Sequence, residues 1–294
     1  MRIGVYGKRI LSEESIDFVQ FIIDLLRNKG VEVYIYHEFM EVIRKNKLIR
    51  TKAESFSEGD DVIGTFDFML SLGGDGTLLE TVTVIRDKGI PIIGINMGRL
   101  GFLASVSKND IYYAIDELLK GSFGLDKRSL LYLECEEPLF GELNFALNDF
   151  VIHKNDSSSM ITIHAFINGE FLNSYWGDGL IVSTPTGSTG YSLSCGGPIL
   201  FPQSGSFAVT PVSPHNLNVR PIIISDESVL SFEIEGRSSS FLVSMDSRSC
   251  SVNYEVQMAI RKAPFGVNLV KLNNSNYLKT LRSKLNWGVD VRNY

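Results

Sequence analysis

The stretch Asp67–Leu79, DFMLSLGGDGTLL, predicts a strand, a glycine-rich turn and a helix in succession. The apolar run before the turn is typical of a strand that is buried on both faces of a parallel sheet. Glycines then remove the side chains from the turn, which allows the backbone to approach a ligand closely. Apolar residues return at helical spacing after Thr77, so Asp75 is expected where a strand ends and a helix begins.

The position of Asp75 allows two interpretations. Open α/β sheets bind ligands at the carboxyl ends of their strands, and the N-terminus of a helix attracts phosphate. In this case Asp75 would be a functional carboxylate in a bare loop. Alternatively, the segment is an ordinary tight turn and Asp75 caps the following helix, since Asp is a favoured N-cap residue.

The overall composition restricts the class of protein. A chain of 294 residues is long enough for one large domain or two ordinary ones. Its net charge of −6 gives no support for nucleic-acid binding. No window reaches the roughly 18 apolar residues of a membrane span, and the first residues lack the apolar core of a signal peptide. Three widely spaced cysteines suit a reducing compartment. We therefore expect a cytoplasmic protein without a membrane or nucleic-acid partner.

The pattern of strands and helices changes near residue 125. Before that point they alternate, which predicts an α/β domain over residues 1–126 with a mostly parallel sheet. Expected features there include a helix from Ser12, a helix at Glu38–Lys47, a polar surface connection at Thr51–Thr65 and a capping box of Ser107 and Asp110. Residues 127–264 show short β-like runs and predict a β-rich second domain. The tail, 265–294, contains a predicted helix at Tyr277–Leu285 and is expected to join the first domain.

A second distinctive stretch is Gly177–Leu200, GDGLIVSTPTGSTGYSLSCGGPIL. A short strand is followed by closely spaced hydroxyl side chains and glycines, which could bind a polar, hydroxylated ligand such as a nucleoside. Alternatively, these hydroxyls bond to their own backbone, as Ser and Thr in loops commonly do. The composition of the loop leaves both interpretations open.

Both stretches resemble motifs of known phosphotransferases. The sequence GGDGT at Gly73–Thr77 is shared by NAD kinases, diacylglycerol and sphingosine kinases and, more loosely, phosphofructokinases. The Gly177–Leu200 stretch resembles the long motif of NAD kinases alone. Further matches follow in the family's order: Gly101-Phe102-Leu103, Asn148-Asp149, His215 in PHNLNVRP, and Leu281 to Gly288. The chain therefore resembles the NAD kinase family from Gly73 to Gly288.

Three positions depart from the family pattern. Asp149 stands where Glu is usual, and Gly190 stands where Ala is usual. Arg248 occupies a position where many members have Gln, which puts a ligand contact there in doubt.

The resemblance implies transfer of the γ-phosphoryl group of ATP, or of another phosphoryl donor, to the 2′-hydroxyl of the adenosine ribose of NAD. Asp75 would be the catalytic base, as a carboxylate can accept the hydroxyl proton. The glycine turn would receive the donor phosphates through Gly73, Gly74, Gly76 and Thr77. The implied NAD-binding residues are Asp75, Gly76, Asn148, Asp149, Asp178, Thr189, Gly190, Tyr191, Ser192, Leu193 and Ser194.

Further expectations concern the cofactor, the assembly and the alternatives. Mg²⁺ or another divalent cation is expected on the nucleotide phosphates, since no metal-binding cluster of protein residues is identified. The resemblance also implies a homodimer or homotetramer, with the site between the two domains. Two alternative functions are a lipid kinase of the diacylglycerol type and an NAD-binding regulator without catalysis.

Overall fold

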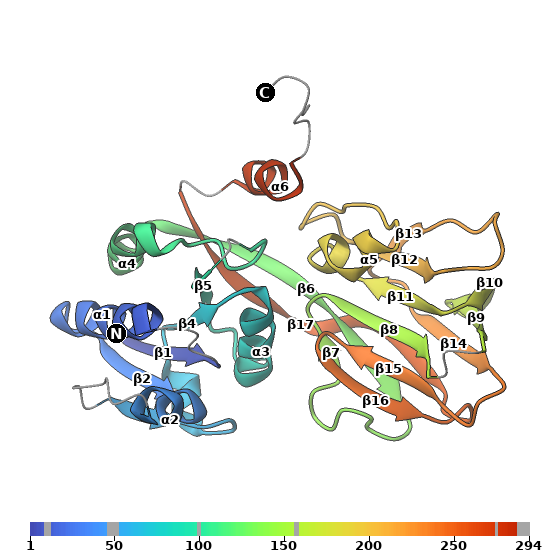
Figure 1. Ribbon diagram of the computed structural model, residues 1–294, viewed down its shortest axis with the longest axis horizontal. Coiled ribbons are helices and arrows are strands. Elements are labelled where there is room, and N and C mark those ends of the chain that lie inside the picture. Colours follow the sequence, from blue (N-terminus) through green and yellow to red (C-terminus); the bar gives the residue numbers. More distant parts are fainter. Residues whose placement is uncertain (9–12, 46–52, 99–100, 156–158, 274–275, 287–294) are drawn as a thin grey trace. The chain divides into compact units, whose positions relative to one another are not determined.

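The computed structural model describes residues 1–8, 13–45, 53–98, 101–155, 159–273 and 276–286 (Figure 1). The chain divides into two compact units, Met1–Lys127 with the segment from Val267, and Arg128–Gly266. Two long strands, β6 (Phe123–Cys135) and β17 (Met258–Leu272), carry the chain from one unit into the other. The predicted fold class, an α/β part followed by a β-rich part and a C-terminal helix, is confirmed.

The first unit contains a parallel sheet with helices around it. Its strands are ordered β17-β5-β4-β1-β2-β3, and every pair in this series is parallel. The strands are β1 (Arg2–Gly7), β2 (Glu32–Tyr36), β3 (Glu54–Phe56), β4 (Phe68–Gly73) and β5 (Ile92–Asn96). The helices are α1 (Glu13–Asn28), α2 (His37–Lys45), α3 (Asp75–Ile85), α4 (Ile111–Lys120) and α6 (Tyr277–Leu285), with 3₁₀ turns at Asp61–Thr65 and Lys108–Asp110.

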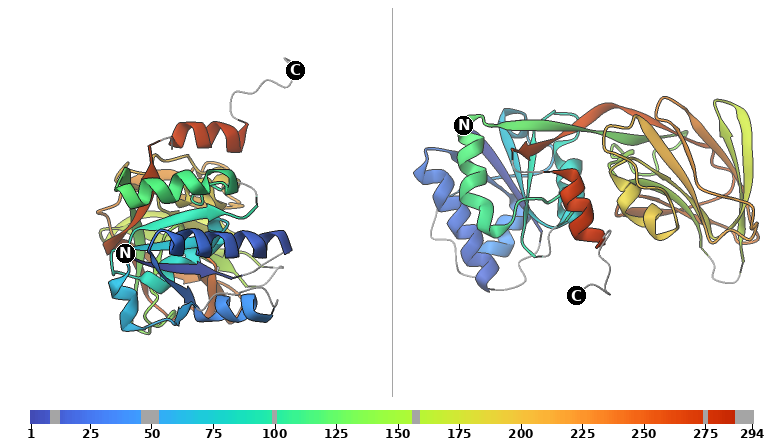
Figure 2. Two further views of the ribbon diagram at one scale, coloured as in Figure 1. Left: turned by 90° about the vertical axis from the view of Figure 1, so that its left-hand side faces the viewer. Right: turned by 90° about the horizontal axis from the view of Figure 1, so that it is seen from above.

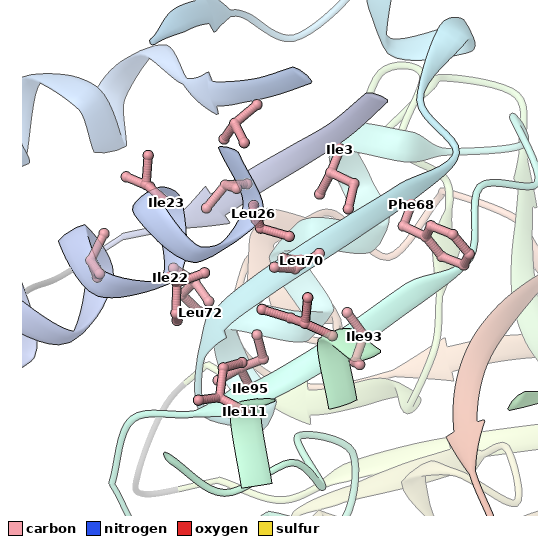
Figure 3. Close-up of a cluster of buried hydrophobic side chains, with 14 of the residues drawn as sticks. Ile3, Ile22, Ile23, Leu26, Phe68, Leu70, Leu72, Ile93, Ile95 and Ile111 are labelled. Atoms are coloured by element: carbon pink, nitrogen blue, oxygen red, sulfur yellow. The ribbon is translucent and has the colours of Figure 1, made fainter. Parts of the chain in front are cut away.

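Strand β4 lies in the interior of this sheet and contacts helices through both of its faces. Phe68, Leu70 and Leu72 point into one core, together with side chains from β1, β5, α1 and α4 (Figure 3). On the opposite face, the Ser71 hydroxyl accepts a hydrogen bond from Thr81 of α3 at 2.9 Å. Helices α1 and α4 lie side by side (Figure 2), with the rings of Phe21 and Tyr112 5.0 Å apart. The glycine turn therefore leaves the sheet from a strand that is fixed on both sides.

Some local predictions for this unit were wrong. The polar segment Thr51–Thr65 was expected to be an irregular connection, but it contains the edge strand β3 and a 3₁₀ turn. A three-residue strand is too short to show an alternating pattern, which explains why it escaped prediction. The expected capping box also does not form, because the Ser107 hydroxyl donates to the Asp110 carboxylate at 2.6 Å instead of either capping a backbone N–H. Ser12, Lys47 and the Trp287–Gly288 pair lie outside the described residues.

The second unit is built from two antiparallel sheets. The first has the order β13-β12-β11-β8-β15-β16, and the other contains β10, β9, β14 and β17, with β6 and β7 paired at its side. The strands are β7 (Phe145–Ala146), β8 (Asp149–Lys154), β9 (Ile161–Ile167), β10 (Glu170–Gly177), β11 (Gly179–Ser183), β12 (Ser206–Val212), β13 (Ile222–Ser225), β14 (Leu230–Glu235), β15 (Phe241–Met245) and β16 (Arg248–Val252). A 3₁₀ turn (Gly187–Thr189) and the short helix α5 (Tyr191–Ser194) follow β11.

The two sheets of this unit share one hydrophobic core. Phe150 of β8 stacks on Phe232 of β14 with ring centroids 5.8 Å apart, which joins the sheets face to face. Strand β12 was not predicted from the sequence. All seven of its residues are buried, so it lacks the alternation of a half-exposed strand, and Pro211 within it argues against a strand.

The C-terminal helix α6 matches its predicted bounds. It begins after Asn276, whose side chain accepts hydrogen bonds from the backbone N–H groups of Leu278 and Lys279. Leu281 is buried, whereas Leu278 and Leu285 are exposed. No helix in the described ranges is long and apolar enough to cross a membrane.

Candidate active site

The glycine turn follows β4 and leads directly into α3. Gly74 occupies the N-cap position, and Asp75 is the first residue of the helix. A methyl group on Gly73 would lie 2.1 Å from the Thr77 hydroxyl oxygen, so the turn closes tightly only with glycine at this position. The backbone N–H of Thr77 donates to the Gly74 carbonyl at 3.1 Å. The predicted strand–turn–helix is therefore present.

Asp75 does not cap the helix through its side chain. Its carboxylate accepts three backbone hydrogen bonds from a neighbouring loop: from Phe102 to Oδ2 at 2.8 Å, and from Leu103 and Ala104 to Oδ1 at 3.0 and 2.9 Å. A methyl group on Gly101 would lie 1.8 Å from Oδ1. The capping interpretation is thus wrong, and the backbone of Phe102, Leu103 and Ala104 holds this carboxylate.

The three hydrogen bonds leave Asp75 with limited capacity to accept more. An ionised carboxylate has about four lone-pair sites, and three of them are used. The remaining acceptor position is on Oδ2, which receives only the Phe102 N–H among the described residues. Asp75 can therefore take one further hydrogen bond, such as that from a hydroxyl group.

A lysine that the sequence analysis did not single out lies at the same edge of the sheet. Lys8 directly follows β1, which pairs with β4 through Gly7 and Leu72. Its ammonium group lies 2.5 Å from the carboxylate of Glu80 on α3, and that carboxylate also accepts from the Tyr6 hydroxyl at 3.2 Å. Burial and the charge of Glu80 raise the pKa of Tyr6 well above its usual range. No motif surrounds Lys8, so only the strand order reveals its position.

In the second unit, Asn148 and Asp149 stand at the start of β8. The Asn148 side-chain oxygen is buried without a hydrogen-bond partner in the part of the chain that the structure describes. The Asp149 side chain is also buried. Burial, and then the negative charge of Asp246, raise the pKa of Asp149 to about 7. Buried polar groups normally have partners, so this pair is prepared for a polar ligand.

The structure brings Gly190 close to this pair. Asp178 acts on Tyr191 but lies beside Lys154, at the other end of β8 from Asn148 and Asp149. Tyr191 is exposed on α5, and its pKa is raised by burial of part of the ring, by the Cys195 thiol and by the charges of Asp178 and Asp149. A methyl group on Gly190 would lie 4.0 Å from both Asn148 Nδ2 and Asp149 Oδ2. Asp178 pairs with Lys154 at 2.7 Å, so it is not a simple solvated acid.

Several hydroxyls of the Ser/Thr-rich loop bond within the protein, whereas the buried Ser183 hydroxyl has no partner in the described ranges. Thr184 donates to the Leu147 carbonyl at 2.5 Å, Ser188 to Pro185 at 2.7 Å and Thr189 to Thr186 at 3.4 Å. The Ser192 hydroxyl is buried against Thr210 at 2.9 Å, so a ligand contact from this residue would come from its backbone. The alternative that these hydroxyls bond within the protein therefore holds for much of the loop, whereas Gly190, Tyr191 and Ser194 are exposed.

Arg248, one of the three departures, has a defined role in the structure. Its guanidinium group donates to the backbone carbonyls of Leu143 and Phe145 and lies over the rings of Phe140 and Phe145. It is therefore engaged in holding the segment before β8. No group of three or more His, Cys, Asp or Glu side chains suited to a metal ion occurs in the described ranges.

Comparison with known proteins shows the family to which the chain belongs. The model of the ATP-NAD kinase N-terminal domain matches residues 8–123, and that of the ATP-NAD kinase C-terminal domain matches residues 147–272. The chain belongs to the NAD kinase family. The NAD kinase of Cytophaga hutchinsonii is 52% identical over 97% of this chain and 98% of its own. That of Flavobacterium psychrophilum is 43% identical over the full length of both chains.

Solved structures of an NADH kinase and an NAD kinase show the same fold. A crystal structure of yeast NADH kinase complexed with NADH matches with a TM-score of 0.86 at 23% identity, covering 99% of this chain and 89% of the yeast chain. An NAD kinase from Archaeoglobus fulgidus in complex with ATP matches with a TM-score of 0.72 at 25% identity, covering 97% and 99%. Both motifs of the NAD kinase family thus lie on the fold expected for them, one in each unit.

Proposed function

We propose that the protein transfers the γ-phosphoryl group of ATP to the 2′-hydroxyl of the adenosine ribose of NAD, which yields NADP and ADP. The observation that carries this proposal is the Asp75 carboxylate, which is fixed by three backbone N–H groups and retains one acceptor position on Oδ2. The family membership of the chain supports the same reaction.

Asp75 is proposed to act as the general base. The ribose hydroxyl donates a hydrogen bond to Oδ2 and transfers its proton there as its oxygen forms a bond to the γ-phosphorus. The bond between the γ-phosphorus and the bridging oxygen breaks at the same time, and ADP leaves. Phosphoryl transfer depends mainly on positioning and on neutralising charge, so a rigidly held carboxylate favours this chemistry.

The second unit is proposed to bind NAD. The Asn148 amide and the Asp149 carboxylate can hold a ribose diol, since the Asn148 oxygen is a buried acceptor without a partner in the described ranges and the Asp149 carboxylate is buried beside it. Asp178 would contact the nicotinamide end. The segment Thr189–Ser194 would contact the adenine end, with the exposed ring of Tyr191 as a flat stacking surface.

The donor phosphates are proposed to bind at the glycine turn, against the backbone of Gly73, Gly74, Gly76 and Thr77. Mg²⁺ or another divalent cation would be held mainly by the phosphates and water, which it prefers to an all-protein cage. Three backbone hydrogen bonds use most of the acceptor capacity of Asp75. This carboxylate therefore has little capacity left to bind the cation, which fits binding through phosphates and water. When bound, the cation would neutralise charge on the phosphates, and Lys8 would add a second positive charge.

A coupled assay tests the proposed reaction. The purified protein is incubated with NAD, ATP and Mg²⁺, and NADP is followed with an NADP-specific dehydrogenase. Formation of NADP is expected. The opposite result is that calorimetry shows NAD binding but no NADP forms with ATP, other nucleoside triphosphates or polyphosphate as the donor. The protein would then only bind NAD, which would contradict the proposal.

The donor site predicts a selective effect of Lys8. We expect Lys8→Ala to raise the KM for ATP about fivefold, the scale of a solvent-exposed charge contact, with little change in the KM for NAD. Lys8→Arg should retain most of the affinity. Lys29→Ala is a matched control, because Lys29 precedes β2 at the opposite edge of the sheet and pairs with Asp116. An unchanged KM for ATP in Lys8→Ala would exclude Lys8 from the donor site.

We further propose that the protein works in the cytoplasm as a homodimer or homotetramer. All three cysteines are unpaired thiols, in keeping with a reducing compartment. Size-exclusion chromatography with light scattering measures the subunit number directly.

A further inference from the structure

We propose that Asp246 is a positioning residue for the NAD site, an inference that rests on the proposed function. Its carboxylate holds the backbone of residues 147–149 and thereby aims the Asn148 and Asp149 side chains at the ligand. Asp246 lies almost one hundred positions away in the sequence and belongs to no motif recognised there.

The contacts of Asp246 are directed entirely at this short segment. Its Oδ2 accepts from the Leu147 N–H at 2.9 Å, and its Oδ1 accepts from those of Asn148 and Asp149 at 2.7 and 3.3 Å. Its own N–H donates to the Asp149 carbonyl at 3.0 Å. One side chain therefore fixes three consecutive backbone donors just before and at the start of β8.

The backbone of Asp246 is shaped for this contact. Strands β15 and β16 pair through Met245 and Arg248, which leaves Asp246 and Ser247 as the turn between them. Asp246 has a φ of 53°, in the left-handed region that non-glycine residues seldom adopt. A glycine would suit this conformation better, so the carboxylate is the feature that explains an aspartate here.

The same segment is held from its other side by the Ser/Thr-rich loop. Thr184 donates to the carbonyls of Leu147 and Asn148, through its hydroxyl at 2.5 Å and its N–H at 2.9 Å. A methyl group on Gly187 would lie 2.1 Å from the Asn148 carbonyl oxygen. Asp246 thus binds the N–H groups and the loop binds the carbonyls, so the orientation of Asn148 is fixed between them.

The charge of Asp246 also acts on Asp149. Besides Asp246, the charged and titratable groups around Asp149 are Arg248 beyond the same turn and Tyr191 on α5, with Asp178 and Cys195 beside that ring. Arg248 and the three N–H groups stabilise the charge of Asp246, although burial still raises the pKa of that carboxyl. Asp149 faces this charge without a hydrogen-bonding donor in the described ranges, so its ionisation is coupled to Asp246.

The first test measures NAD affinity by calorimetry, without a phosphoryl donor, on both sides of pH 7. For the unmodified protein, affinity should weaken as the pH falls through about 7, because Asp149 loses its charge. In Asp246→Asn, the affinity for NAD above that pH should fall about tenfold. The midpoint of the pH dependence of this affinity should also move to lower pH. Ser247→Ala, in the same turn, is the control and should behave as the unmodified protein.

Two results of this test would overturn the proposal. One is Asp246→Asn binding NAD as tightly as Ser247→Ala. The other is a loss of affinity with an unmoved midpoint, which would indicate a general structural defect. Asp246→Gly suits the left-handed backbone and so keeps the turn if Asp246→Asn fails to fold. It should show the same two changes.

A second test requires no substrate, so it separates failure of this inference from failure of the proposed function. The pKa of Asp149 is raised in the folded protein from an ordinary 3.8 to about 7. Between these two pH values the unfolded chain binds fewer protons than the folded protein does. The free energy of unfolding measured in urea should therefore fall as the pH rises. Asp149→Asn should remove the part of this decline that Asp149 contributes, and Asp246→Asn should make the part from Asp149 end at lower pH. A decline unaffected by Asp246→Asn would refute the coupling.

Discussion

Asp75→Asn is expected to lower kcat by at least about 10²-fold while NAD binding stays nearly intact, the usual scale for loss of a general base. The amide lacks the basic oxygen that would take the ribose proton. Because an amide has a single acceptor oxygen, Asn would also keep the hydrogen bonds from Leu103 and Ala104 but place an NH₂ group opposite the Phe102 N–H. Single-turnover kinetics with saturating ATP measure the loss in the chemical step.

The control for this variant is NAD binding by calorimetry, together with a circular dichroism melt that shows the fold is kept. Asp110→Asn provides a matched substitution, because Asp110 lies before α4 and its carboxylate contacts only the Ser107 hydroxyl among the described hydrogen bonds. A near-normal kcat in Asp75→Asn would rule out Asp75 as the base.

Gly101→Ala is expected to reduce kcat to a similar extent, about 10²-fold, although Gly101 carries no chemical group. Its added methyl would lie 1.8 Å from Asp75 Oδ1, and the end of the Asp75 side chain must move to make room. That movement breaks the hydrogen bonds that hold the carboxylate. Stability should change little, because a side-chain terminus yields more easily than backbone. The measurements are kcat and the midpoint of unfolding in urea, for the variant and for the unmodified protein.

Gly98→Ala is the matched control for this prediction. Gly98 lies in the same connection after β5, but a methyl group there has no heavy atom of the described residues within 4 Å. Normal activity is expected. If Gly101→Ala were as active as Gly98→Ala, a fixed carboxylate would not be needed for the reaction.

Much of the fold could be predicted from the sequence because its periodic patterns are long. The apolar run before Gly73 and the helical spacing after it gave the central strand and α3, and the helix Tyr277–Leu285 was predicted at its observed bounds. The predictions failed where burial removes the alternation, as in β12, or where the element is very short, as in β3. In these places tertiary packing, not local pattern, decides the conformation.

The candidate site was predictable only in part. Motif resemblance singled out Asp75, Asn148 and Asp149 as candidates, since their neighbours in sequence are distinctive. The groups that orient them come from distant positions: the backbone of Phe102 for Asp75, and Asp246 for Asn148 and Asp149. Hydrogen bonds of this kind depend on how strands and loops meet in the fold, and a single sequence carries no local signal for them.

The internal bonding of the Ser/Thr-rich loop has a thermodynamic consequence. Since Ser188 and Thr189 bond within the loop and Thr184 ties the loop to Leu147, the loop is ordered before the proposed NAD ligand binds. Little conformational entropy is then lost on association, so modest contacts suffice for tight recognition. Selectivity among ligands must then come from the few polar groups that are not used within the protein. The chief ones are the Asn148 oxygen and the Asp149 carboxylate.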